Sequence, residues 1–260
     1  MTIKIKLKQY TNGKILNKVS RKIHKWLMLF IGVQFVIWSV TGTYMVFFDI
    51  DYIHGDSLVV NHQDKINPHD IEYSLNTLFG EYPNAENIRL STFLQQPVYR
   101  FKVNTQSGPV QFLLDARSGK PLSPITESKA IEAAHYYSTL GKVKSVVLIT
   151  DNPPFELSPR VLPAWRINFD DFGAPSLYFS QSTGELVGKR HIFWRLFDWM
   201  FRFHVMEYKD GGDIGNWLLF VVTFFAILGC VSGLIMTCFL LVRPTKKLAT
   251  SHKKISRDVI

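Results

Sequence analysis

Two long runs of apolar residues, neither containing a charged residue, most constrain how this chain can fold. The first extends from Trp26 to Phe48 (23 residues) and the second from Ile214 to Val242 (29 residues). A helix of about 20 residues is long enough to cross the hydrocarbon core of a membrane, which is roughly 30 Å thick. The sequence therefore predicts two transmembrane helices, at 26–48 and 214–242.

The positive charge of the chain gathers at its two ends. Residues 1–25 hold eight Lys and Arg and no acid, and residues 243–260 hold six against Asp258. These tails account for more than the whole net charge of +9, so the remainder is acidic. Basic segments beside membrane spans stay in the cytoplasm. Both tails are therefore expected to be cytoplasmic, and the charge reflects membrane topology rather than nucleic-acid binding.

The first span is predicted to remain as an anchor. Its apolar region is longer than that of a signal peptide, and the stretch 47–50 (Phe-Phe-Asp-Ile) lacks the small residues of a cleavage site. Residues 49–190 are then expected to form an extracytoplasmic domain. Both cysteines, Cys230 and Cys238, lie in the second span, so this domain must be held by packing rather than by disulfides.

The segment between the spans contains an internal repeat. One copy runs from Tyr99-Arg100 through Gly108 to a closing Gly119, and the other runs from Trp165-Arg166 through Gly173 to a closing Gly184. Apolar and polar residues alternate around each Gly-containing turn, which predicts two β-hairpins. Helical patterns accompany them at 69–79 and 127–140, the second with an Ala-rich face. The domain is predicted to be α+β, and its sequence contains no motif for an enzyme site.

A further helix is predicted at residues 191–210, at the outer edge of the membrane. At 100° per residue, Arg195 and Asp198 fall on its polar face, whereas His204 lies on the opposite face with Phe201. An imidazole in apolar surroundings must find a partner or cost a few kcal/mol. Metal ligation is one of the few ways to satisfy it.

Several segments resemble the PepSY-associated transmembrane family, and together they cover nearly the whole chain. They are RKIHKWLMLFIGVQFVIWSVTGTYM in the first span, DIDYIHG at its outer end, the hairpin segments FLLDARSGKPL and LPAWRINFDDFGAPSLYFSQSTGELVGKR, and WRLFDWMFRFHVMEY before the second span. The resemblance implies a PepSY-type α+β domain between two transmembrane helices.

Members of this family include haem-b reductases of the bacterial inner membrane that reduce ferric iron or ferric siderophores in the periplasm. The resemblance implies the same function here, with haem-ligating histidines at positions matching His24 and His204. The chain has no dinucleotide-binding motif between a strand and a helix, so a cytosolic flavin reductase or reduced flavin would supply the electrons. The alternative is a non-redox PepSY module that binds a peptide or an envelope partner.

Larger relatives carry four or more spans, and the two spans here suggest a homodimer that holds one or two haem b groups. Gly229 and Gly233 form a patch of small residues that serves either helix packing or dimerisation. Gly42 lies five helical turns after His24 on the same face, where a porphyrin or another helix could lie. His24 and His204 are expected about 30 Å apart, so they cannot ligate one iron.

The pairing of ligands in such a dimer stays open. His24 could pair with its mate, and His204 with its mate or with His54. His54 is otherwise a solvated loop residue or part of an iron-docking patch, because ferric iron favours carboxylate oxygen. His191 lies well away from His204 around their helix and could instead contact a haem propionate. The candidate iron-docking residues are Asp51, His54, Asp56 and Glu207.

Overall fold

The computed structural model describes residues 2–62, 64–106, 108–208 and 215–241. The chain divides into two compact units. The helical unit comprises Met1–Thr43 and Phe201–Ile260, and the sheet unit comprises Tyr44–Met200. The predicted basic tail at 243–260 and the first and last residues of the predicted span at 214–242 lie outside the described residues.

The helical unit contains the two helices that could span a membrane. They are α1 (Thr2–Phe47) and α6 (Trp217–Leu241). The same unit also contains the C-terminal end of α5 (Ile192–Val205). In the described part of the chain, Asn17–Phe47 of α1 and the whole of α6 are long and apolar enough to cross a bilayer. Large apolar side chains on both helices are exposed, at 73% for Phe30 and 74% for Phe220. Such surfaces suit lipid rather than water.

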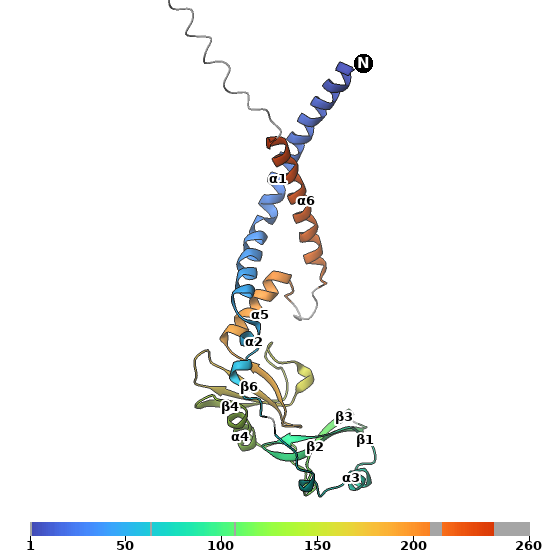
Figure 1. Cartoon of the computed structure of the whole chain (residues 1–260), viewed down its shortest axis with the longest axis vertical. Coiled ribbons are helices and arrows are strands. Elements are labelled where there is room, and N and C mark those ends of the chain that lie inside the picture. The colour runs from blue at the N-terminus through green and yellow to red at the C-terminus, as the bar shows by residue number, and fades with distance from the viewer. Residues whose placement is uncertain (1, 63, 107, 209–214, 242–260) are drawn as a thin grey trace, which may run out of the picture. The chain divides into compact units, whose positions relative to one another are not determined.

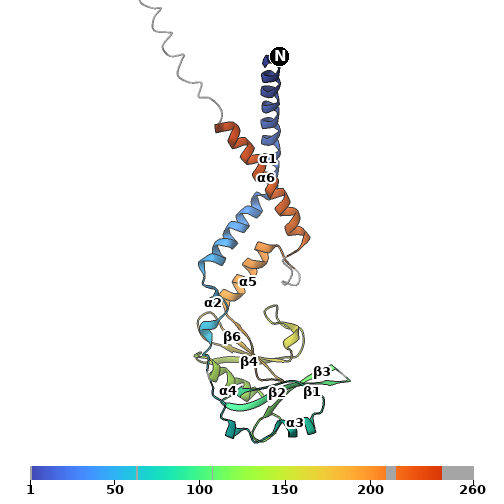
Figure 2. The same cartoon turned by 45° about the vertical axis from the view of Figure 1, so that its right-hand side comes forward.

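Helices α1 and α6 cross each other, as both views of the chain show (Figure 1, Figure 2). Ile31 of α1 is only 2% exposed, and a Cβ added at Gly229 of α6 would come within 3.2 Å of its Cδ1 atom. Small residues at such a crossing let the two backbones approach closely. The patch at Gly229 and Gly233 therefore faces α1 of the same chain, which favours the packing interpretation of these glycines.

The sheet unit holds two antiparallel sheets. The first has the order β1-β2-β3 and the second the order β4-β5-β6-β7. Their strands are β1 (Ala85–Phe93), β2 (Gln96–Thr105), β3 (Gly108–Asp115), β4 (Val143–Ile149), β5 (Ala164–Phe169), β6 (Ser176–Ser180) and β7 (Leu186–Arg190). The α-helices of this unit besides α5 are α2 (Ile50–Ile53), α3 (Leu75–Glu81) and α4 (Glu127–Tyr137), and the 3-10 helices are η1 (Asp56–Leu58), η2 (Pro68–Asp70) and η3 (Pro159–Val161).

The two predicted hairpins are confirmed. Strands β2 and β3 pair with Arg100 opposite Leu113, and strands β5 and β6 pair with Arg166 opposite Tyr178. Each copy of the repeat ends, after the second strand of its hairpin, at a glycine with positive φ, +71° at Gly119 and +67° at Gly184. Side chains at these positions would also meet an aromatic ring, because an added Cβ would lie 2.4 Å from Tyr73 at the first glycine and 2.8 Å from Phe93 at the second. Glycine is therefore required twice, once in each copy of the repeat.

Both sheets contribute to one core. Helix α4 packs its fully buried alanines against Val98 and Leu113 of the first sheet and Phe169 and Phe179 of the second, and these alanines are Ala130, Ala133 and Ala134. The Ala-rich face predicted at 127–140 is therefore the face that lies in the core.

The helix predicted at 69–79 is wrong in its extent. The α-helix there is α3, which starts at Leu75, and only a 3-10 turn lies before it. Ser74 has an extended backbone, and its hydroxyl accepts a hydrogen bond from the amide of Thr77. Ser74 is therefore the N-cap of α3, and the helix begins at Leu75, six residues later than predicted.

Candidate functional site

His24 on α1 is held by the backbone of α6. Its Nδ1 lies 3.0 Å from the carbonyl oxygen of Gly229 and 3.2 Å from the hydroxyl oxygen of Ser232. A carbonyl can only accept, so Nδ1 carries the proton and donates it. The Ser232 hydroxyl donates its own proton to the same carbonyl at 2.8 Å, so its oxygen also accepts from Nδ1. In a neutral imidazole this arrangement leaves the lone pair on Nε2.

A glycine makes room for the His24 ring. A Cβ added at Gly233 would lie 2.9 Å from Cε1 of His24, closer than real Cβ contacts allow, and 3.3 Å from Nδ1. The imidazole therefore lies directly against the α6 backbone, and any side chain at Gly233 would displace it.

His204, near the end of α5, is held in the same way by α1. Its Nδ1 lies 2.9 Å from the hydroxyl oxygen of Thr41, a residue that is 3% exposed. The Thr41 hydroxyl donates to the carbonyl of Ile37 at 2.8 Å, so its oxygen accepts the proton of Nδ1. Among the described residues, neither His204 nor His24 makes a hydrogen bond through Nε2.

Two more residues of α1 support His204. The indole nitrogen of Trp38 donates to the His204 carbonyl at 2.7 Å. Gly42 lies beside the ring, because an added Cβ there would be 3.6 Å from Cε1 of His204. The predicted stripe through Trp38 and Gly42 is thus the surface on which His204 rests.

The two histidines are far apart along α1. His204 is anchored at Thr41, which lies 17 residues after His24 in one continuous helix. At a rise of 1.5 Å per residue, the two anchoring points are about 25 Å apart. The predicted separation is supported, and each histidine belongs to a site of its own.

His54 and His191 belong to the sheet unit. His54 follows α2 and is exposed. His191 is 3% exposed, donates through Nε2 to the carbonyl of Tyr52 at 2.9 Å, and packs its ring against Tyr52 and Phe193. Burial lowers the pKa of His191, so the ring is neutral. The surroundings of His191 thus give it a packing role, and they offer no support for a contact with a cofactor.

The predicted iron-docking residues form no metal site within the described residues. No group of three or more His, Cys, Asp or Glu side chains there is arranged to hold a metal ion. Asp56 is paired with Lys189, and the hydrogen bond and charge of that lysine hold the pKa of Asp56 below its usual value. Its charge is therefore already balanced. Asp51 and His54 are exposed in the same unit, whereas Glu207 belongs to the helical unit.

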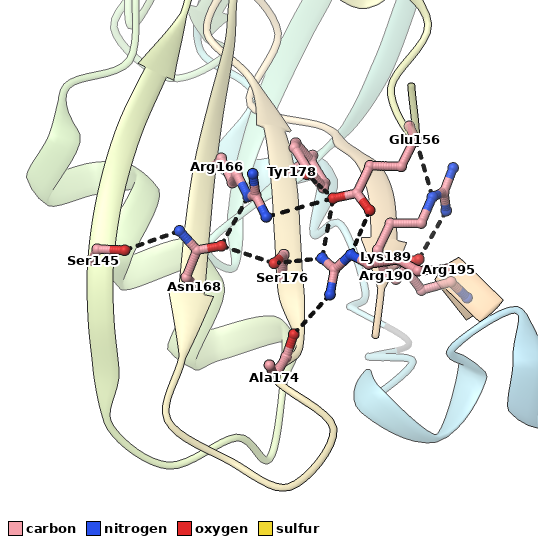
Figure 3. Close-up of polar contacts among 10 residues, drawn as sticks. All are labelled: Ser145, Glu156, Arg166, Asn168, Ala174, Ser176, Tyr178, Lys189, Arg190 and Arg195. Atoms are coloured by element: carbon pink, nitrogen blue, oxygen red, sulfur yellow. Dashed lines mark hydrogen bonds and ion pairs between the residues drawn. The ribbon is translucent and has the colours of Figure 1, made fainter. Parts of the chain in front are cut away.

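A buried carboxylate, Glu156, connects the first turns of α5 to the second sheet (Figure 3). Glu156 is 4% exposed and accepts hydrogen bonds from Arg195 at 2.6 and 3.0 Å and from the hydroxyl of Tyr178. Arg166 lies 3.6 Å from the same carboxylate, and Arg190 donates to the Glu156 carbonyl at 3.0 Å. Burial opposes ionisation of Glu156, but the hydrogen bonds and charges of Arg195, Tyr178 and Arg166 outweigh it and lower the pKa below its usual value.

Glu156→Gln is expected to destabilise the sheet unit by about 3 kcal/mol at pH 7, because Arg195 loses its buried counter-charge. The pKa of Glu156 is lowered on folding, so its contribution is present above the unfolded value of about 4.3 and is lost as the pH falls through the folded value. Denaturant unfolding of the full chain in detergent, followed by circular dichroism at pH 7 and at acid pH, measures this difference. Glu132→Gln, at an exposed ion pair with Lys129, is the matched control and should change stability by at most about 0.5 kcal/mol. Equal effects of the two substitutions would contradict the role of Glu156.

Sequence reasoning missed Thr41, Ser232 and Glu156. A hydroxyl inside an apolar span was the available signal for Thr41 and Ser232, since such residues often form hydrogen bonds between membrane helices. Glu156 is a single acid in a loop, and nothing in the sequence distinguishes it from a solvated residue.

One family model matches the chain over residues 21–258, and its description is "PepSY-associated TM region". The match includes most of the first candidate span, the whole of the second, the sheet unit, and the segments that carry His24 and His204. No match was found among curated proteins or among solved structures.

Proposed function

The chain belongs to the PepSY-associated transmembrane family, and from this premise we propose that it binds b-type haem and carries electrons across the membrane to reduce ferric iron or ferric chelates. Family membership makes it a membrane protein with a PepSY domain. When bound, haem iron supplies a one-electron redox centre with axial ligands from the protein. His24 and His204 are the residues that would hold it.

One observation carries this proposal: both histidines have the same tautomer and the same unused nitrogen. Each donates Nδ1–H to an oxygen on another helix, which leaves the lone pair of Nε2 available. Histidines that ligate metals are typically oriented by a hydrogen bond from the other ring nitrogen. An ordinary packing histidine such as His191 uses Nε2 itself in a hydrogen bond.

Glycines beside the two rings also favour this function. Gly233 leaves the His24 ring flat against α6, and Gly42 leaves space beside the His204 ring. Close packing against a helix backbone fixes each ring, which is what a metal-binding histidine requires. Because the two sites are about 25 Å apart along α1, electrons would pass between two haem groups, one near each membrane face.

A homodimer would complete the ligand sets. His24 and His204 are the only histidines in the described part of the helical unit, so this unit would supply one histidine to each proposed site. A second copy related by a twofold axis would bring His24 to its mate and His204 to its mate. Pairing of His204 with His54 is the other arrangement for the outer site.

The proposed orientation of the chain in the membrane is based on the charged tails and on helix α5. The basic ends would keep both termini in the cytoplasm, where a flavin reductase or reduced flavin would donate electrons, and the PepSY domain would lie in the periplasm. Ile192, Leu196 and Trp199 share one face of α5 and are 51%, 43% and 47% exposed. Arg195, which binds Glu156, lies about 60° from Ile192 around the helix and so at the border of this face. An apolar face of this kind suits a helix that lies at the membrane edge.

The proposal is tested by a visible spectrum of the full chain, purified in mild detergent from cells supplied with haem. We expect a Soret band that shifts and sharpens on reduction with dithionite, and no haem on a denaturing gel, because the chain has no C-x-x-C-H motif for covalent attachment. A colourless but folded preparation would exclude haem transfer. It would leave the second candidate, a non-redox PepSY binding module, which is favoured by the cationic cleft of the sheet unit described below.

A further inference from the structure

The sheet unit contains a cleft of about 550 Å³ between its two sheets. Strands β1 and β2 form one wall, and the turn between β6 and β7 forms the other. The polar side chains of the lining belong to Asn87, Arg89, Arg100, Lys102, Gln111, Thr183 and Glu185. This volume lies in the range of small-molecule sites, which is roughly 300–1,000 Å³.

Positive charge predominates in the cleft. Its lining includes three cationic side chains and a single carboxylate, that of Glu185, which pairs with Arg89 at 3.2 Å. Lys102 has a partner outside the lining, Glu86 at 3.4 Å, and its side chain is 34% exposed. A second cavity of about 420 Å³ shares Lys102 and Glu185 with the first and adds Arg160. The two together form a cationic groove that would attract anions.

Arg100 is the unusual member of this set. Its side chain is only 7% exposed, yet its guanidinium binds neutral oxygens, those of the Ser91 hydroxyl and of the Thr92 and Thr183 carbonyls. In the described part of the chain, the nearest carboxylate is Glu185, at 3.9 Å and without a hydrogen bond to Arg100. Burial lowers the pKa of Arg100 and the charge of Glu185 opposes this. A guanidinium in this position keeps its charge and has an incomplete counter-charge.

The second copy of the repeat contains an arginine at the corresponding position, and the carboxylate beside it can be compared with that beside Arg100. Arg166 holds the place in β5 that Arg100 holds in β2, and it lies 3.6 Å from the buried carboxylate of Glu156 (Figure 3). Both arginines have a carboxylate within 4 Å, but Glu156 beside Arg166 has a side chain that is 2% exposed, whereas Glu185 beside Arg100 is 38% exposed and also pairs with Arg89. One partly exposed carboxylate thus serves two arginines, and an anionic ligand would balance the positive charge that remains in the cleft.

We propose that this cleft binds a small polycarboxylate anion. Arginine forks bind carboxylates with two hydrogen bonds, so the exposed side chains of Arg89 and Lys102 would hold the carboxylates, while buried Arg100 adds its positive charge behind them. Gln111 and Thr183 offer neutral polar groups for a hydroxyl, and Ile88 and Phe101 offer apolar contact for the carbon skeleton. The biological role of this anion rests on the proposed function: it would be the chelator that carries ferric iron. The cleft would then bind the ferric chelate rather than bare iron.

The test is a calorimetric titration of the full chain in detergent with citrate, with ferric citrate and with inorganic phosphate. Citrate should bind more tightly than phosphate, and its affinity should fall as salt is added. The double variant Arg89→Gln/Lys102→Gln should weaken citrate binding by about tenfold or more, because two charge contacts are lost. Both side chains lie at the open rim, at 68% and 34% exposed, so the variant is expected to fold.

The matched control is Lys129→Gln/Lys144→Gln. These lysines also form exposed ion pairs in the sheet unit, with Glu132 and Asp170, and neither lines the cleft. The control should bind citrate like the wild type. Phosphate binding equal to that of citrate, or an equal loss in both double variants, would overturn the proposal. Haem content is read separately from the same samples, so failure of citrate binding would leave the haem assignment standing, and a colourless protein that binds citrate would leave the cleft standing.

Discussion

His204→Ala is expected to abolish ferric reduction and to remove the haem bound at the outer site. The apolar surroundings of His204 provide no replacement ligand, and the side chain of Thr41, which accepts the hydrogen bond from Nδ1, contains no nitrogen that could bind the iron. Loss of an axial ligand should lower the rate by about two orders of magnitude or more, because transfer through that site stops. Haem content per chain and the rate of ferric reduction in membrane vesicles measure the effect.

His135→Ala is the control for this substitution, since His135 is exposed on α4 in the sheet unit. It should keep both the haem and the activity.

Thr41→Val separates ligation from orientation, because the His204 ligand remains while the hydrogen bond to its Nδ1 is lost. Haem should be retained with a shifted midpoint potential, and Thr41→Ser should restore the wild-type potential. Wild-type haem content in His204→Ala would show that His204 is not a ligand.

Gly229→Ile/Gly233→Ile is expected to separate α1 from α6 and to disrupt the site at His24. The new side chains would collide with Ile31 and with the His24 ring, which lie 3.2 and 2.9 Å from an added Cβ. Overpacking of this kind costs about 1–3 kcal/mol, so occupancy of the His24 site should fall roughly tenfold. Haem loading and the mass of the particle in mild detergent are measured together.

Gly32→Ile is the matched control, because an added Cβ at Gly32 of α1 meets nothing within 4 Å. It should leave haem loading unchanged. The packing interpretation predicts that the double variant loses haem while the dimer persists. Dissociation into monomers with the haem retained would instead assign the glycines to the contact between two chains.

Much of the architecture was predictable from local sequence because it depends on local physics. Uncharged apolar runs give membrane-crossing helices wherever they occur, since a helix satisfies its own backbone. The alternation around Gly108 and Gly173 was enough to predict two hairpins, because turn residues and strand period act within a few positions. The helix predicted at 69–79 is wrong since a single side chain, the Ser74 hydroxyl, sets where α3 begins.

Candidate ligands were also visible in the sequence, because a histidine among apolar residues needs a partner wherever the chain folds. By itself, the sequence determined the two spans, the repeated hairpins and the candidacy of His24 and His204. The tertiary structure decided what holds each ring. Ser232 meets His24 across 208 residues and Thr41 meets His204 across 163, and these hydrogen bonds exist only where two helices cross. The same holds for Glu156 and Arg100, because the charged groups beside them come from segments distant in the sequence, which no local pattern brings together.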